Sequence, residues 1–196
     1  MIGVLVSGEG TNLQALMDAD LPIAAVASNR REVRALERAR EAEIPAASFP
    51  LDRFPDREIR DAMMAEWLAG HGVELVVCAG YMHLLRPVFL DRFRGRVINT
   101  HSAPLPDFPG AHPIEDVLAA GLRETAATVH YVDEGIDSGP VIRAETVPVE
   151  DDDTVETLRE RVQAVEHRIL PEVVRELLVA GSGPPQAVWR RREQCE

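Results

Sequence analysis

The 196-residue sequence predicts an α/β fold with an open twisted sheet, mostly parallel, and helices on both faces. Short β-branched runs alternate with helix-forming segments over about the first hundred residues, which is typical of a doubly wound sheet. Apolar residues make up 45% of the chain and aromatic residues only 5%, as in the buried strands of parallel sheets. Two later strands lie close together in sequence, so we expect an antiparallel C-terminal part.

The first half alternates between strand-like and helix-like segments. A strand over 2–7 precedes a glycine-containing turn and a helix with Leu13, Leu16 and Met17 on one side. The nearly apolar run 75–80 is expected at the centre of the sheet. The remaining strands are predicted at 23–28, 46–49 and 97–101, and the remaining helices at 32–42, 56–69 and 87–93.

The second half is expected to hold a helix over 113–120 and strands over 126–132 and 141–149, joined by a loop over 133–139. With the first half, these elements predict a Rossmann-like fold. We assign no element to the tail, which contains Trp189.

Two long helices have an apolar stripe. In the helix over 56–69, the stripe is formed by Ile59, Met63 and Trp67 at helical spacing. The last helix is expected to start at the N-cap candidate Asp153, with Glu156 three residues later. We expect Pro171 to kink or restart this helix, which ends near Gly181. Its stripe is formed by Leu158, Val162, Val165 and Ile169.

The composition excludes several classes of protein. A formal net charge of -12 argues against non-specific binding to nucleic acid or anionic membranes, although backbone groups can still bind a small anion.

Cys78 lies in an apolar run and Cys195 near the end, which favours free thiols in a reducing cytosol over a disulfide framework. The start lacks a basic segment typical of a signal peptide, and no run is long enough for a membrane span. We therefore expect a cytoplasmic protein.

A glycine-containing turn over 7–12 joins the first strand to the first helix. Glycines let the backbone approach a ligand, and the helix N-terminus offers free N–H groups to an anion. A dinucleotide motif would need a glycine where Leu13 stands and an acid where the second strand leads into Asn29, Arg30 and Arg31. The pattern favours a phosphate monoester over NAD, while an ordinary capped turn remains the alternative.

Asn99 and His101 are two apart on a predicted strand, so their side chains share a face. They lie at the carboxyl end of that strand, where α/β sheets bind ligands. An amide donor beside an imidazole can stabilise an oxyanion and move a proton, although local capping explains the pair equally well. Asp137 lies in the glycine-containing loop 133–140, where it could orient His101 or belong to a plain acidic turn. The spacing of His101, His112 and His130 does not suggest a metal site.

Eight segments together resemble the phosphoribosylglycinamide formyltransferases of the folate-dependent purine pathway. They occur in the expected order over about residues 2–180: VSGEGTNLQA at 6–15, ASN at 27–29, ERAR at 37–40, VCAGYM at 77–82, NTH at 99–101, LPDFPG at 105–110, DSGPVI at 137–142 and RVQAVEH at 161–167. No single segment is diagnostic, but their joint order is specific.

The resemblance implies that the amine of glycinamide ribonucleotide attacks the formyl carbon of 10-formyltetrahydrofolate. It implies that Asn99 and His101 stabilise the oxyanion and that Asp137 charges His101 and holds a proton-relay water. The phosphoribosyl substrate is expected at Gly10, Thr11, Asn12, Leu13, Gln14, Gln163, Ala164, Val165 and Glu166. The folate is expected at Arg57, Met82, His83, Leu84, Leu85, Asn99, Asp133, Glu134, Gly135, Ile136 and Asp137. No metal is implied.

The resemblance also implies one domain over 1–181, with a phosphate-binding half over about 1–100 and a folate-binding half over about 101–181, then a tail over 182–196. A homodimer is possible. The loop 102–106 reads SAPLP, where the family usually has PSLLP, and the following segment GAHP at 110–113 also departs from the family. Glu9 must point away from a bound phosphate, or Arg30 or Arg31 must offset it.

Three alternatives are considered, two within the wider formyltransferase-like family and one from a different class. The enzyme that formylates initiator tRNA has an added C-terminal RNA-binding domain, for which this chain is expected to be too short and too acidic. The enzyme that hydrolyses 10-formyltetrahydrofolate has an added N-terminal domain, for which a first strand at Ile2 leaves no room. A binding module without catalysis remains open because of the altered loop 102–106.

Overall fold

The computed structural model describes residues 1–181 and contains a seven-stranded sheet in the order β3-β2-β1-β4-β5-β6-β7. Its strands are β1 (Ile2–Val6), β2 (Ile23–Ser28), β3 (Ala46–Ser48), β4 (Leu75–Cys78), β5 (Val97–His101), β6 (Glu124–Tyr131) and β7 (Val141–Pro148). The segment around Trp189, to which the sequence assigned no element, lies outside the described residues.

The sheet is mixed, as the sequence predicts. Strands β1 to β5 pair in parallel, while β6 pairs antiparallel with β5 and with β7. All five residues of β1 are buried, and so are all four of β4. The two strands lie side by side in the middle of the parallel part, so the most apolar runs occupy the most enclosed positions.

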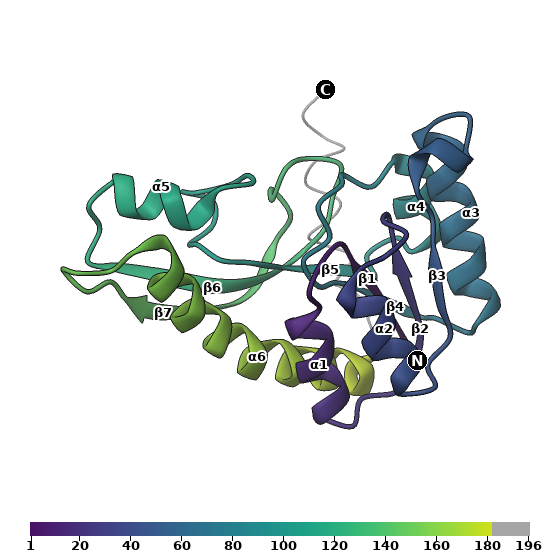
Figure 1. Cartoon of the computed structure of the whole chain (residues 1–196), viewed down its shortest axis with the longest axis horizontal. Helices are drawn as coiled ribbons and strands as arrows, with labels where there is room; N and C mark the ends of the chain where they lie inside the picture. Colours follow the sequence, from purple (N-terminus) through teal and green to yellow (C-terminus); the bar gives the residue numbers. More distant parts are fainter. Residues whose placement is uncertain (182–196) are drawn as a thin grey trace.

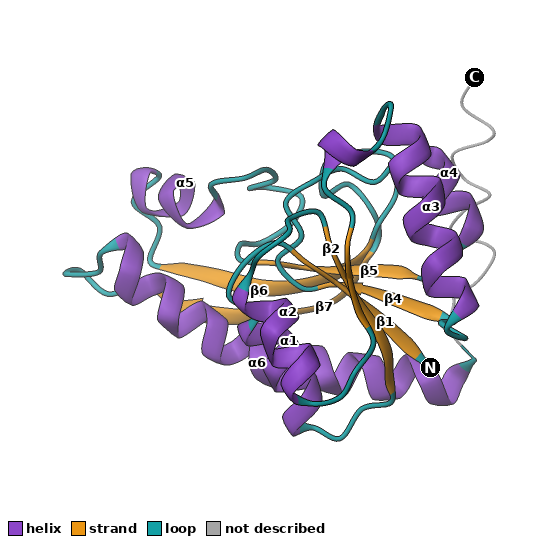
Figure 2. Cartoon of the chain, turned by 45° about the vertical axis from the view of Figure 1, so that its right-hand side comes forward, coloured by secondary structure: helices purple, strands orange, loops and turns teal. Residues whose placement is uncertain are grey.

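Helices cover both faces of the sheet (Figures 1 and 2). On one face, α1 and α2 lie beside the long α6; on the other, α3 packs with α4. A fifth helix, α5, lies at the end where β6 and β7 extend away from the parallel strands. The helices are α1 (Thr11–Asp18), α2 (Arg34–Glu41), α3 (Arg57–Gly70), α4 (Pro87–Arg92), α5 (Pro113–Ala119) and α6 (Val155–Ala180), with a 3₁₀ turn at Leu51–Arg53.

The turn before α1 requires glycine at position 10. Gly10 has a φ of 74°, and a Cβ there would lie 2.6 Å from the Cβ of Ala35 in α2. A side chain would therefore force the turn and α2 apart. The close approach brings the start of α1 against α2 and fixes where the N-terminal N–H groups of α1 point.

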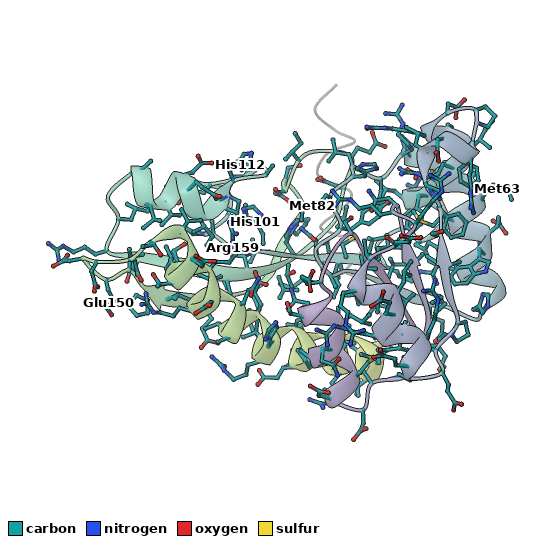
Figure 3. All side chains as sticks on the ribbon, viewed as in Figure 1. Met63, Met82, His101, His112, Glu150 and Arg159 are labelled. Carbon is teal, nitrogen blue, oxygen red and sulfur yellow. The ribbon has the colours of Figure 1, made fainter. Side chains whose placement is uncertain are left out.

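The predicted apolar stripe of α3 is only partly buried: Trp67 packs against the core, but the other two residues do not. Ile59 is 44% exposed and Met63 is 55% exposed, and Met63 lies on the outer side of the helix (Figure 3). The buried residues of α3 are Arg60, Asp61, Met64, Ala65 and Leu68. The helix can turn this side inward because Arg60 and Asp61 neutralise each other in a buried ion pair, which the apolar spacing does not reveal.

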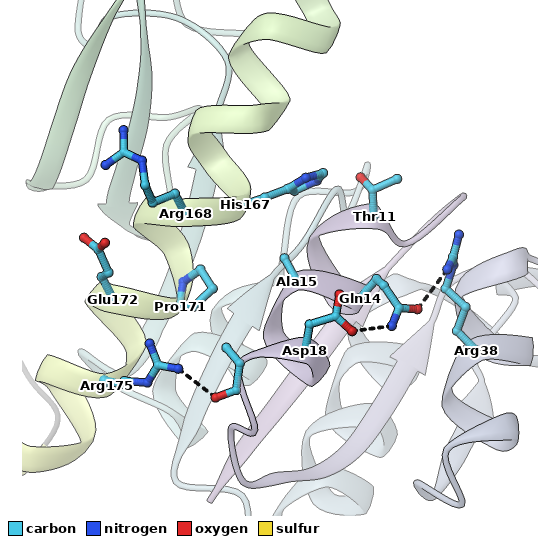
Figure 4. A pocket seen from close by; sticks show the side chains of 11 residues that line it. Thr11, Gln14, Ala15, Asp18, Arg38, His167, Arg168, Pro171, Glu172 and Arg175 are labelled. Carbon is cyan, nitrogen blue, oxygen red and sulfur yellow. Dashed lines mark hydrogen bonds between the residues drawn. The ribbon is translucent and has the colours of Figure 1, made fainter.

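Two expectations for α6 are corrected. Thr154, not Asp153, is the N-cap: its side chain accepts the N–H of Thr157, whose hydroxyl accepts the N–H of Thr154. Asp153 instead accepts from Arg161 in an ion pair. The helix also continues unbroken through Pro171, so Pro171 does not restart it. Pro171 is buried and faces the cleft between α6 and α1 (Figure 4), so packing offsets the one backbone hydrogen bond that its ring removes.

Replacing Thr154 by alanine is expected to lower the free energy of unfolding by about 1 kcal/mol, because the first turn of α6 loses its side-chain acceptor. Urea unfolding followed by circular dichroism would measure the change. Thr154→Ser keeps the hydroxyl and should stay near the original stability. An alanine variant as stable as the original chain would show that this cap does not stabilise α6.

Among residues 1–181, no helix combines the length and the apolar character that a membrane span requires.

Candidate active site

A cavity of about 500 Å³ lies where β4 and β5 end. Its wall combines the segment after β4, the end of β5, the loop between β6 and β7, and one side of α6. The carboxyl ends of parallel strands are the usual ligand site in such sheets. Residues predicted for catalysis and for both substrates line it together: Met82, His83, Leu84, Leu85, Asn99, His101, Asp133, Gly135, Ile136, Asp137, Gln163 and Glu166.

Asn99 is held by His130, which stands opposite it on β6. Asn99 Nδ2 lies 3.1 Å from His130 Nε2, and His130 Nδ1 lies 2.9 Å from the carbonyl oxygen of Tyr131. A carbonyl only accepts, so Nδ1 has a proton, while Nε2 faces both the Asn99 amide and Asp137 Oδ1. At most one N–H of Asn99 points at His130, which leaves the other for a ligand.

His101 is 6% exposed and has a neighbour at each ring nitrogen. Nε2 donates to the carbonyl oxygen of Phe108 at 2.6 Å, and Nδ1 lies 3.5 Å from Asp137 Oδ2. His101 and Met82, both labelled in Figure 3, line the same cavity. The carbonyl oxygen of Phe108 therefore stands where the oxygen of a ligand would have to lie to accept a hydrogen bond from Nε2.

Asp137 lies between the two imidazoles. Its Oδ1 is 3.5 Å from His130 Nε2 and its Oδ2 is 3.5 Å from His101 Nδ1, while Oδ2 also accepts the N–H of Gly110 at 2.9 Å. Burial alone would raise the pKa of Asp137, but contacts with His130, Gly110 and His101 outweigh it and hold the pKa below its usual value. The carboxylate therefore stays ionised beside the two imidazoles.

The backbone of the loop between β6 and β7 sets the position of Asp137. Asp137 has a φ of 48°, in the left-handed region. At Gly139, a Cβ would lie 1.7 Å from the carbonyl oxygen of Tyr131. Only glycine permits this approach, so the loop is pressed against the end of β6 and Asp137 is directed toward His101.

Glu166 connects three segments of the site. It is 4% exposed; Oε2 accepts from Asn12 Nδ2 at 2.9 Å and Oε1 from Ser102 Oγ at 2.7 Å. The loop 102–106, which departs from the family pattern, thus contributes a donor to the predicted phosphoribosyl site. Glu166 and Gln163 face the same cavity, as their spacing on a helix predicts.

Other predicted residues lie apart from this cavity. Thr11 and Gln14 line a second cleft of about 610 Å³ between α1 and α6, where Gln14 Oε1 accepts from Arg38 (Figure 4). The side chain of Leu13 is buried in the core, so it offers a ligand only its backbone. The remaining predicted residues that do not line the main cavity are Gly10, Asn12, Arg57, Glu134, Ala164 and Val165.

The charge of Glu9 is not offset by Arg31. The Glu9 side chain is exposed, and Arg31 pairs with Asp52 at 2.7 Å. The cation that contacts the turn is Arg38, whose Nε donates to the carbonyl oxygen of Glu9 at 3.0 Å. The turn therefore has an arginine beside it that sequence reasoning did not single out.

Cys78 lies at the floor of the cavity and is expected to be chemically inert. It is 5% exposed, and burial raises its pKa to about 12, with a smaller contribution from Asp137. Since only the thiolate reacts, Cys78 should stay unlabelled by iodoacetamide at pH 8 in the native protein and become labelled in urea. Peptide mapping by mass spectrometry would follow Cys78 separately from Cys195. Labelling of native Cys78 at the rate of an exposed thiol would contradict its burial.

Comparison with known proteins identifies the family. A family model described as formyl transferase matches residues 1–174. A phosphoribosylglycinamide formyltransferase of Mycobacterium tuberculosis is 46% identical over 182 residues, which cover 91% of this chain and 85% of that protein. The chain belongs to the formyltransferase family. A Bacillus subtilis phosphoribosylglycinamide formyltransferase is 33% identical over 181 residues, covering 89% of this chain and 93% of that one.

Solved structures agree with the fold of this formyltransferase. Glycinamide ribonucleotide transformylase 1 from Symbiobacterium toebii superposes with a TM-score of 0.88 at 45% identity, covering 92% of this chain and 87% of that chain. Within residues 1–181, no group of three or more metal-ligating side chains could hold an ion.

Sequence reasoning on this formyltransferase missed three contributors: His130, Ser102 and the carbonyl oxygen of Phe108. His130 was weighed only as a metal ligand, because the pairing of β5 with β6 that places it against Asn99 is not visible in the sequence. Alternation along β6, with polar Thr128 and His130 two apart on one face, is the signal that could have indicated it.

Proposed function

We propose that this formyltransferase transfers the formyl group of 10-formyltetrahydrofolate to the amine of 5-phosphoribosylglycinamide, giving formylglycinamide ribonucleotide and tetrahydrofolate. The names of its relatives support this assignment. The observation that favours catalysis over a binding module is the placement of Asn99, His101 and Asp137 around one cavity, with Asp137 3.5 Å from His101.

Attack of the amine on the formyl carbon forms a tetrahedral centre with negative charge on the former formyl oxygen. In this proposal the free N–H of Asn99 donates to that oxygen. His101 Nε2–H becomes a second, charge-assisted donor once the oxygen replaces the carbonyl of Phe108. Movement of the loop around Phe108 is therefore part of substrate binding in this proposal.

Asp137 supports the proton transfers. Its ionised carboxylate favours protonated His101 and can accept a proton from the attacking amine through a water. The same proton then passes to the folate nitrogen as the bond between that nitrogen and the formyl carbon breaks. No metal is needed, because the two donors and the carboxylate together balance the charge that develops.

The two substrates have distinct walls in this proposal. Met82 is 64% exposed, Leu84 52% and Ile136 57%, and these exposed apolar side chains suit a flat heteroaromatic ring such as the pterin. The phosphoribosyl end would lie against the turn before α1, with Glu166 and Gln163 beside it. The phosphoribosyl wall does not lie wholly in the expected phosphate-binding half, about 1–100. Two of its residues, Glu166 and Gln163, belong to α6, which lies in the half over about 101–181.

A cytoplasmic location and a homodimer remain predictions. The acidic charge and the reducing environment that suits Cys78 favour the first, and size-exclusion chromatography with light scattering would decide the second.

An assay with glycinamide ribonucleotide and 10-formyltetrahydrofolate tests the proposed function. We expect formylglycinamide ribonucleotide and tetrahydrofolate in equal amounts, and no product with formate and ATP instead. Hydrolysis of the formyl folate without transfer, or transfer only to another phosphorylated amine, would contradict the proposal. Binding of both substrates without turnover would favour a non-catalytic module.

A further inference from the structure

Arg60 and Asp61 form an ion pair on the buried side of α3. Both side chains are 0% exposed, and Arg60 Nε donates to Asp61 Oδ1 at 2.6 Å. The other carboxylate oxygen of Asp61 accepts the backbone N–H of Arg86 at 2.8 Å. Burying a guanidinium is costly unless its donors are paired. The partners of the remaining donors therefore indicate what Arg60 holds in place.

The next donor of Arg60 faces His83. Arg60 Nη1 lies 2.9 Å from His83 Nδ1. A guanidinium has only donors and stays protonated in proteins, so Nδ1 must accept and cannot have a proton. His83 is thereby fixed as the neutral tautomer with its proton on Nε2. Nη2 has no hydrogen-bond partner within residues 1–181, so Asp61 and His83 are the side chains that Arg60 holds there.

The surroundings of His83 keep its ring neutral. Burial, then Arg60 and Arg57 on α3, and more weakly Arg30 lower the pKa of His83, whereas Asp61 opposes them. The ring of Tyr81 packs edge-on, with centroids 6.1 Å apart. His83 also lines the main cavity beside Met82 and Leu84. Its Nε2–H is thus a neutral donor of fixed orientation in the wall assigned to the folate.

We propose that Arg60 is a positioning residue that fixes His83 as an Nε2–H donor to an acceptor oxygen of the formyl donor. The proposal rests on the proposed function, because it assigns the ligand of this wall. Arg60 does not line the cavity, so it acts through His83 and not by contact. Because the proton of His83 is fixed on Nε2, the ring donates from that atom alone, and it favours a ligand with an acceptor atom opposite Nε2.

Removing the charge of Arg60 would leave Asp61 buried and unpaired, so such a variant risks unfolding. Arg60→Lys keeps a cation for Asp61, but a single ammonium on a flexible stem cannot reproduce the fork that reaches both partners. His83→Phe removes the donor directly. Met64→Leu alters another buried residue of α3 and serves as the control for a general packing effect. Thermal unfolding would confirm that each variant is folded.

The KM for each substrate and kcat separate a positioning role in folate binding from a role in catalysis or in general packing. We expect the KM for 10-formyltetrahydrofolate to rise about three- to tenfold in Arg60→Lys and in His83→Phe, as for one lost hydrogen bond, with kcat and the KM for glycinamide ribonucleotide nearly unchanged. In the double variant, Arg60→Lys should add nothing further, because its effect passes through His83. Met64→Leu should leave the folate KM unchanged. Additive effects, or a fall confined to kcat, would overturn the proposal.

Nitrogen NMR of histidine-labelled protein gives a readout that does not depend on turnover. We expect the neutral ring of His83 to have its proton on Nε2 in the original chain at pH 8, and to populate both neutral tautomers in Arg60→Lys. A proton on Nδ1 in the original chain would overturn the proposal. If the chain proved unable to transfer formyl groups, the proposed function would fail separately, and calorimetry with 5-formyltetrahydrofolate would compare the same variants by Kd.

Discussion

Replacing Asp137 by asparagine is expected to lower kcat by roughly 10²- to 10³-fold, with little change in the KM for either substrate. The substitution removes the charge that favours protonated His101 and the acceptor for the proton of the amine, while the shape is kept. Asparagine tolerates the left-handed conformation that Asp137 adopts, with a φ of 48°. The loss should therefore reflect charge rather than a distorted loop.

Steady-state kinetics with each substrate varied in turn measures the effect. Asp152→Asn is the matched control, since it makes the same chemical change at an exposed position before α6 that lines neither cavity, and it should keep normal kcat. His101→Ala should lower kcat to a similar degree, because the imidazole and the carboxylate act together. Near-normal turnover of Asp137→Asn or His101→Ala would show that the assigned roles are wrong.

The pKa of Asp137 also sets an expectation for pH dependence. Because this pKa is held below its usual value, the carboxylate is ionised throughout the neutral range. Its contribution to kcat and to stability is present above the ordinary pKa of about 3.9 and is lost only as the pH falls through the lower folded value. Any change of kcat between pH 6 and 9 must therefore come from groups other than Asp137.

Much of the fold follows from local patterns. Alternating strands and helices predict the parallel part, and the closely spaced β6 and β7 predict the antiparallel part. Boundaries differ by a few residues, as at β6, which begins at Glu124 instead of residue 126. The prediction is wrong where the packed environment overrides the local pattern: α3 buries the adjacent Arg60 and Asp61 as an ion pair and leaves Ile59 and Met63 exposed. Likewise, α6 continues unbroken through the buried Pro171.

Several residues that line the main cavity were predicted from the sequence, but the geometry between them was not. Asn99 and His101 share a strand, so their common face follows from the two-residue period. The contact of Asp137 with His101 joins residues 36 positions apart, by subtraction of their numbers, and depends on how the β6–β7 loop folds back. The same holds for Ser102, whose bond to Glu166 gives the altered loop a role that no family pattern indicates.

Replacing Asn99 by aspartate is expected to lower kcat by about 10³-fold or more, whereas Asn99→Ala should cost about 10²- to 10³-fold. Alanine only removes a donor to the developing oxyanion. Aspartate removes the donor and places a negative charge beside another, which repels the transition state in a partly buried site. Both variants should bind the folate nearly as well as the original chain, because the charge develops only during the reaction.

Steady-state kinetics of the two variants under the same conditions measures the difference. A defect in Asn99→Asp that is no larger than in Asn99→Ala would mean that the formyl oxygen lies elsewhere.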